Sequence, residues 1–176
     1  MKTGVVLALL RTLFDIIRLR RGPDALPYSP LLFLIIGLMW LIAGLVMTLA
    51  TAELDKQDFI IGSLTGIVGI ACYAAIVVLV GKGARLLQTV MALLGCGALL
   101  SLMYVAGDLL LTPLLGDDLS IMIVTLILLW TVPVEGHIIS RAIERHWYLG
   151  VAIAMGVFIF QLKLYSILNP SAVAAT

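Results

Sequence analysis

Two ionisable residues that could exchange a proton stand two positions apart near the end of an apolar run, in VPVEGHIISRAIERHWYLG. Glu135 and His137 could form a proton-handling pair, because ionisable side chains at membrane depth are costly and usually functional. His137, Arg141 and Glu144 recur at intervals of four and three, which places them on one face of a continuing helix. The alternative, which we favour, is a helix end in the headgroup layer, where Arg141 and Arg145 bind phosphates.

The sequence offers few residues for metal binding or catalysis. Glu135 and His137, with His146 nearby, do not supply the three or four ligands on one face that a closed metal site needs. The sequence also has no glycine-rich phosphate loop, no serine nucleophile elbow and no HExxH motif. We therefore expect no catalytic residue, no metal and no cofactor, and we rank an enzyme acting on lipid last.

Asp108 and Lys163 are the charged residues that lie deepest in apolar runs. Each is within a turn or two of a run's end, so each could extend toward water. The sharper hypothesis is an ion pair between Asp108 and Lys163, which would join the third and fifth of the helices described below.

The composition places the chain among membrane proteins. Of its 176 residues 62% are hydrophobic and only 12% are charged, and the mean hydropathy is +1.19. A water-facing surface cannot cover such a chain, so lipid must surround most of it. The formal net charge of +1 gives no argument for nucleic acid as a partner, and we expect none.

Five apolar runs, each long enough to cross a hydrocarbon core of about 30 Å, predict an all-α integral membrane protein. The connections between the runs are short, so consecutive helices should be antiparallel neighbours in one bundle, residues 31–170. A small-residue tail, residues 171–176, follows. We expect the five transmembrane helices at residues 31–51, 59–80, 86–111, 119–139 and 147–168.

Residues 1–30 precede the bundle and have a different pattern. Residues 4–21 keep a helical period, with Arg11, Asp15 and Arg18 along one stripe of an otherwise apolar surface. This segment is too charged to cross a bilayer and too apolar to lie free in water, which predicts an interfacial amphipathic helix. A Gly-Pro pair should end it, and two further prolines lead into the first span.

The distribution of charge predicts the orientation of the bundle. With five spans, one arrangement places most basic residues on one side, and the positive-inside rule makes that side cytoplasmic. We therefore expect the N-terminus inside and the C-terminus outside, in the inner membrane of a cell. The residues expected inside are Lys2, Arg11, Arg18, Arg20, Arg21, Lys82, Arg85, Arg141 and Arg145, against Lys56 and Lys163 outside. The acids expected outside are Glu53, Asp55, Asp58, Asp108, Asp117 and Asp118.

Two surfaces of the bundle should make contacts. Gly62, Gly66 and Gly69 give the second helix a flank that lets another helix approach, either inside the bundle or between copies. At the inner face we expect a basic rim that contacts anionic headgroups. A membrane-protein partner, or a second copy in a homo-oligomer, should bind through this rim and the lipid-facing helices. The rim consists of Arg11, Arg18, Arg20, Arg21 and Arg145.

The RRGPDALPYSP entry, the five closely spaced spans and the GHIISRAIERHWYLG passage together resemble small bacterial inner-membrane proteins of the Yip1-like family. The resemblance implies a five-helix bundle and a non-enzymatic role as a scaffold, adaptor or accessory subunit of a membrane complex. The acidic Asp-Leu-Tyr-Gly-Pro signature of the eukaryotic members is absent, so their role beside small GTPases is not carried over. The competing class is a small proton-coupled transporter or channel that uses Glu135 and His137.

Overall fold

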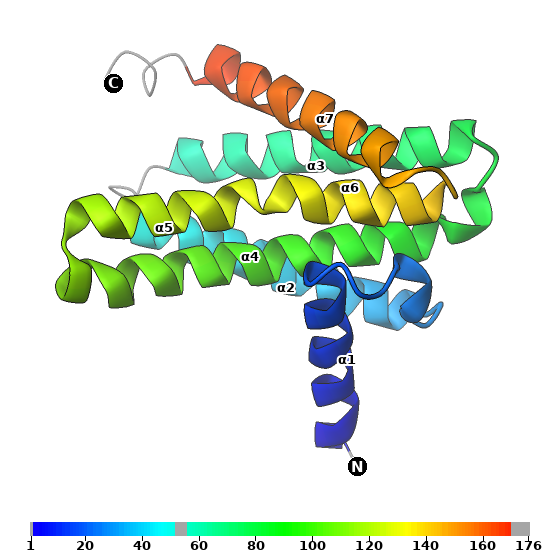
Figure 1. Ribbon diagram of the computed structural model, residues 1–176, viewed down its shortest axis with the longest axis horizontal. Helices are drawn as coiled ribbons and strands as arrows, with labels where there is room; N and C mark the ends of the chain where they lie inside the picture. The colour runs from blue at the N-terminus through cyan, green and yellow to red at the C-terminus, as the bar shows by residue number, and fades with distance from the viewer. Residues whose placement is uncertain (1, 52–55, 170–176) are drawn as a thin grey trace.

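The computed structural model describes residues 2–51 and 56–169, and in these ranges every regular element is a helix (Figure 1). Five helices are long and apolar enough to cross a membrane. The tail at residues 171–176, Glu53 and Asp55 lie outside the described residues, as do the side chains of Lys2, Lys56 and Asp58. The elements are α1 (Lys2–Ile17), η1 (Pro23–Ala25), α2 (Pro30–Thr51), α3 (Lys56–Leu79), η2 (Gly83–Arg85), α4 (Leu86–Leu115), α5 (Asp117–Leu129), α6 (Thr131–Ala142) and α7 (Trp147–Leu168).

The first and last spans begin and end within one residue of the predicted positions. At the start of α2, the hydroxyl of Ser29 accepts a hydrogen bond of 3.3 Å from the backbone N–H of Leu32, and Pro30 occupies the first helical position. Both are established helix-start features, because the first turn has N–H groups without partners and proline lacks an N–H.

The third span is longer than predicted. We expected the span to end at residue 111, but α4 continues through Pro113 to Leu115. Near the C-terminal end, the lost hydrogen bond and the bend that a proline causes affect only the last turn of the helix. The helix ends at Gly116, whose φ of 80° suits a glycine, and α5 then begins with Asp117 and Asp118.

The fourth span is divided into two helices. α5 ends at Leu129 and α6 begins at Thr131, although together they make one continuous apolar stretch, Asp117–Ala142. Pro133 accounts for the break, because it has no N–H to donate to the carbonyl of Leu129 one turn earlier.

The helices α2, α3, α4 and α5–α6 run along one axis, while α7 crosses α6 obliquely and α1 lies across the bundle (Figure 1). Burial is concentrated in α4 from Thr89 to Leu100 and in α6 from Val132 to Ala142. The other half of the α4–α5 pair exposes large apolar side chains such as Leu109, Leu114 and Met122. Apolar exposure of this extent suits helices that face lipid.

α1 occupies the segment predicted as an amphipathic helix, but its exposed surface is mixed. Val6 and Leu7 are 58% and 61% exposed, beside the exposed Arg11. Leu13 and Ile16 are fully buried against the bundle. The N-terminal helix is thus packed on the bundle along one face, and its opposite face is not simply polar.

Candidate functional site

The predicted polar cluster of Glu135, His137, Arg141 and Glu144 is divided among three places. Two positions apart on a helix means about 200° around its axis, so Glu135 and His137 point to opposite faces of α6. Glu135 faces the bundle interior, His137 and Arg141 face the segment after α1, and Glu144 faces the α3–α4 turn. The structure therefore does not form the Glu135–His137 pair.

Inside the bundle, the hydroxyl of Tyr73 on α3 donates a hydrogen bond of 2.7 Å to Oε2 of Glu135 on α6. On α7, the amide of Gln161 donates a hydrogen bond of 3.1 Å to the carbonyl of Thr65. These side chains border an interior cavity of about 110 Å³. The interior cavity is lined by Trp40, Gly66, Gly69, Ile70, Tyr73, Leu93, Gly97, Glu135 and Gln161.

A larger groove of about 490 Å³ lies beside the interior cavity, in the half of the bundle away from the Lys82–Arg85 turn. It is bordered by the second half of α2 and the first half of α3, with single residues from α4 and α7. Its polar lining includes Thr48, Ser63, Ser101 and Tyr165. Trp40 lines both the groove and the interior cavity.

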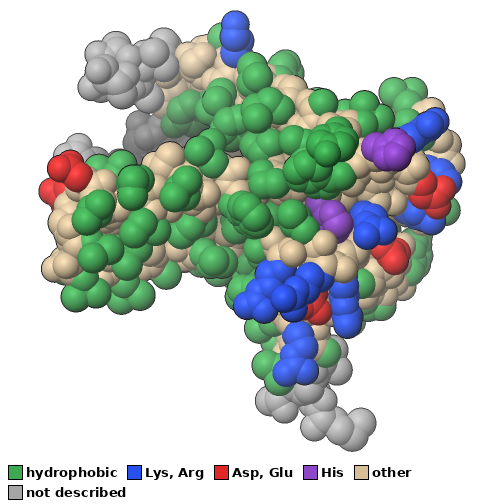
Figure 2. Space-filling view, viewed as in Figure 1, with side chains coloured by type: hydrophobic (Ala, Val, Ile, Leu, Met, Phe, Trp, Pro, Cys, Tyr) green, Lys and Arg blue, Asp and Glu red, His purple; other side chains and the backbone are tan. Residues whose placement is uncertain are grey.

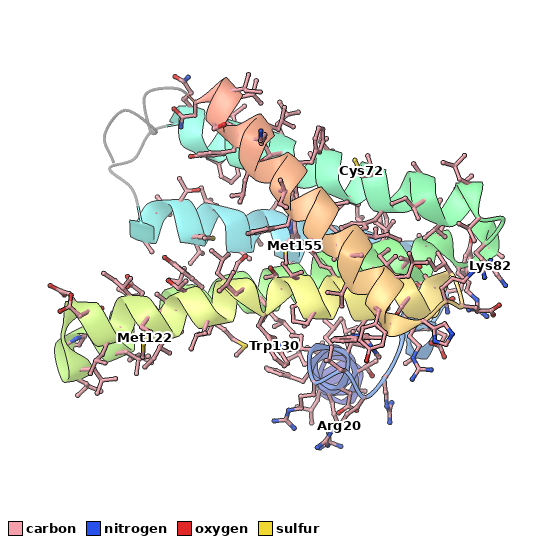
Figure 3. All side chains as sticks on the ribbon, turned by 45° about the horizontal axis from the view of Figure 1, so that its top comes forward. Arg20, Cys72, Lys82, Met122, Trp130 and Met155 are labelled. Carbon is pink, nitrogen blue, oxygen red and sulfur yellow. The ribbon has the colours of Figure 1, made fainter. Side chains whose placement is uncertain are left out.

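The end of α1 is held on α6 by two hydrogen bonds. The indole N–H of Trp130 donates to the carbonyl of Ile17 at 3.1 Å, and Nε2–H of His137 donates to the carbonyl of Arg21 at 3.0 Å. Figure 3 shows Trp130 directed toward α1. A Cβ on Gly22 would lie 3.2 Å from Cβ of Arg141, so the residues after α1 pack closely on α6.

At the end of the bundle where α6 stops, Glu144 pairs with Lys82 and with Arg85, whose Nη2 lies 2.6 Å from Oε1. Arg85 also donates a hydrogen bond of 3.2 Å to the carbonyl of Arg141. The hydrogen bond from Lys82 and the charges of Arg85 and Lys82 lower the pKa of Glu144 below its ordinary value. Glu144 has a φ of 55°, a left-handed conformation that is costly for a side-chain-bearing residue.

The residues of the predicted basic rim are all exposed, and Figure 2 shows most of the Lys and Arg side chains on this face gathered on one part of the molecule. Lys and Arg side chains gather over the end of α1, the neighbouring end of α6 and the Lys82–Arg85 turn. We call this region the basic end. Arg21 pairs with Asp15 at 3.3 Å, and Arg20 extends away from the bundle (Figure 3). A hollow of about 820 Å³ at this end is lined by Arg85, Arg141, Arg145, His137 and His146 among others.

Asp108 and Lys163 do not form the predicted ion pair. The ion pairs among the described residues join Asp15 to Arg21 and Glu144 to Lys82 and Arg85. Lys163 is exposed and Asp108 half-buried, on helices that diverge as α7 turns away from α4 (Figure 1). The alternative, in which each side chain extends toward water, stays a prediction.

The three predicted packing glycines differ in their surroundings. A Cβ on Gly66 would lie 2.8 Å from the indole of Trp40, and one on Gly69 would meet the side chain of Gln161. A Cβ on Gly62 would meet nothing within 4 Å, since this residue borders the groove. Gly66 and Gly69 thus make room for side chains inside the bundle.

The sequence interpretation missed the closest helix contact. A Cβ on Gly136 of α6 would lie 2.7 Å from Cα of Val151 on α7, and one on Gly150 would lie 2.7 Å from Cβ of Ser140. No repeat within one helix signals this contact, because the two glycines lie on different helices. The sequence interpretation also missed Tyr73, Trp40 and Gln161, which line the interior cavity with Glu135.

The described residues hold no group of three or more His, Cys, Asp or Glu side chains that could bind a metal ion. Cys96 directs its Sγ to the carbonyl of Leu13 at 3.8 Å, and both Cys72 and Cys96 are free. Comparisons of the chain with protein-family models, with curated proteins and with solved structures find no match.

Proposed function

We propose that the protein is a non-enzymatic adaptor or accessory subunit of a membrane complex, which holds a membrane-protein partner at its basic end. The observation that carries the proposal is a set of exposed guanidinium groups with no ion-pair partner among the described residues, at Arg18, Arg20 and Arg145. Exposed and unpaired charges of one sign, gathered on one surface, favour a partner of the opposite charge.

The orientation belongs to the same proposal. The basic end faces the cytoplasm of a cell with an inner membrane, which places the N-terminus inside and the C-terminus outside. α1 lies across the bundle axis, as a helix in the headgroup plane would, and its arginines then reach anionic lipid headgroups. The resemblance to Yip1-like proteins favours the same adaptor role.

The contacts within the basic end support a docking role. Glu144 ties the α3–α4 turn to the end of α6, and Trp130 and His137 fix the end of α1. A surface whose backbone is already fixed loses little entropy when a partner binds. The unpaired arginines are therefore presented on a preorganised support.

Purification from native membranes in mild detergent, followed by mass spectrometry, tests the proposal. The adaptor role predicts one stoichiometric membrane-protein partner with an acidic cytoplasmic segment. A protein that purifies only with a second copy of itself, or only with anionic lipid, contradicts it. Single-cysteine labelling at positions in residues 27–29 and near residue 116 tests the orientation separately, with labelling expected from the cytoplasmic and the opposite side respectively.

A proton-coupled transporter is the second candidate, because Glu135 faces the interior of the bundle and the interior cavity. The Glu135–His137 pair no longer supports it, since the two side chains point to opposite faces of α6. What remains of this candidate is Glu135 itself.

A further inference from the structure

The carboxyl group of Glu135 borders the interior cavity. Glu135 is held by the hydroxyl of Tyr73, and the side-chain amide of Gln161 lies at the same cavity. Five helices contribute to the wall, namely α2, α3, α4, α6 and α7. A volume of about 110 Å³ exceeds what a single water molecule requires, and polar walls of this kind hold water.

Trp40 forms the wall between the interior cavity and the groove. Two glycines make room for its indole: a Cβ would lie 2.8 Å from Cζ2 at Gly66 and 3.7 Å from Nε1 at Gly97. The linings of the two spaces therefore meet at this one side chain.

The packing of the bundle interior differs between the two sides of the interior cavity. Toward the basic end the interior is filled by side chains with no exposed surface, among them Val77, Met91 and Ile138. Away from the basic end lies the groove, with the hydroxyl groups of Ser63 and Ser101 on its wall. Space next to the interior cavity therefore lies on the side of the groove and not toward the basic end.

We propose that Glu135 is a proton-binding site that is reached from the groove, with Trp40 as the barrier between the groove and the interior cavity. Among the described residues, the titratable groups near Glu135 are Tyr73 on α3, which donates to it, and Cys96 on α4, whose Sγ is directed to Leu13. α2 and α7 present Trp40 and Gln161, which do not titrate. This inference goes beyond the adaptor role and does not depend on it.

Proton binding is measured on the purified protein in lipid nanodiscs by infrared difference spectroscopy between acidic and alkaline pH. The proposal predicts a band of a protonated carboxylic acid that is lost in Glu135→Gln and kept in Glu144→Gln, the matched control at the basic end. Tyr73→Phe, which leaves the carboxyl in place, should move the pH midpoint of this band. A band that persists in Glu135→Gln, or a midpoint that Tyr73→Phe leaves unchanged, overturns the proposal.

Access is measured by thiol labelling in a background with Cys72→Ala and Cys96→Ala. A small charged thiol reagent should label Ser63→Cys in the groove at once. It should label Gly97→Cys in the interior cavity only after Trp40→Ala is added, and the control Trp147→Ala should have no effect. Labelling of Gly97→Cys with Trp40 in place, or no labelling of Ser63→Cys, contradicts the proposed path.

Discussion

The hydroxyl of Tyr73 lies 2.7 Å from Oε2 of Glu135 and donates a hydrogen bond that joins α3 to α6. In the apolar interior of a membrane bundle a carboxyl group without a partner is costly, so this bond positions both helices. It also directs Glu135 away from His137, which instead donates to the carbonyl of Arg21. One face of α6 thus lines the interior cavity, and the opposite face holds the N-terminal segment.

Tyr73→Phe should destabilise the protein by about 1 to 2 kcal/mol, because it leaves the carboxyl of Glu135 without its donor. Thermal unfolding followed by fluorescence-detected size exclusion measures the change. Tyr104→Phe is the matched control, since its hydroxyl has no hydrogen-bond partner in the described part of the chain. Equal stability of the two variants would show that the bond to Glu135 contributes nothing.

Gly150→Ala should destabilise the contact between α6 and α7. The new Cβ would meet the carbonyl of Gly136 and lie 2.7 Å from Cβ of Ser140. Overpacking of this kind costs about 1 to 3 kcal/mol. Gly156→Ala on the same helix has open space around the new Cβ, and the same thermal assay should find it unchanged within about 0.5 kcal/mol. A tolerated Gly150→Ala would contradict the close approach of the two helices.

Trp130→Phe should loosen the end of α1, because phenylalanine cannot donate to the carbonyl of Ile17. Limited trypsin digestion in detergent measures this, since cleavage after Arg20 and Arg21 requires that segment to leave the bundle. Trp147→Phe is the control, because that side chain is 43% exposed and contacts Tyr148 through its ring. The expected result is faster cleavage in Trp130→Phe alone, and equal rates in both variants would argue against the docking contact.

The ion pairs of Glu144 should contribute stability that depends on pH. The folded protein lowers the pKa of this carboxyl from 4.5, so the contribution is fully present above that value. It is lost as the pH falls through the lower pKa of the folded state, where the carboxyl takes up a proton. The difference in thermal midpoint between wild type and Glu144→Gln should therefore be constant above pH 4.5 and shrink in more acidic buffer. A difference that grows on acidification would give the wrong sign for these contacts.

The spans could be predicted from the sequence because uncharged runs report directly on contact with lipid. The position of α2 and α7 followed from such runs and their polar ends. The break at Trp130 did not, since a proline can either kink a helix or be absorbed near its end. Pro133 interrupts its span near the middle, whereas Pro113 lies within the last turn of α4 and does not interrupt it.

The interior site was only half predictable. Glu135 was a candidate because its residue type is costly in an apolar run, but its partner Tyr73 is 62 positions away and is brought near by helix packing. The helical period alone already separates Glu135 from His137, since two positions turn a helix by about 200°. This angular separation favoured separate roles for Glu135 and His137 over a proton-handling pair.

The most direct test of the adaptor role is the recovery of a partner from native membranes by a charge-reversal variant. The double variant Arg18→Glu and Arg20→Glu alters exposed side chains that form no ion pair among the described residues, and Lys163→Glu is the control on α7. The account predicts that wild type and Lys163→Glu retain one stoichiometric membrane-protein partner, which the double variant loses although it still inserts into the membrane. Recovery of the same partner by the double variant, or of none by wild type, would contradict it.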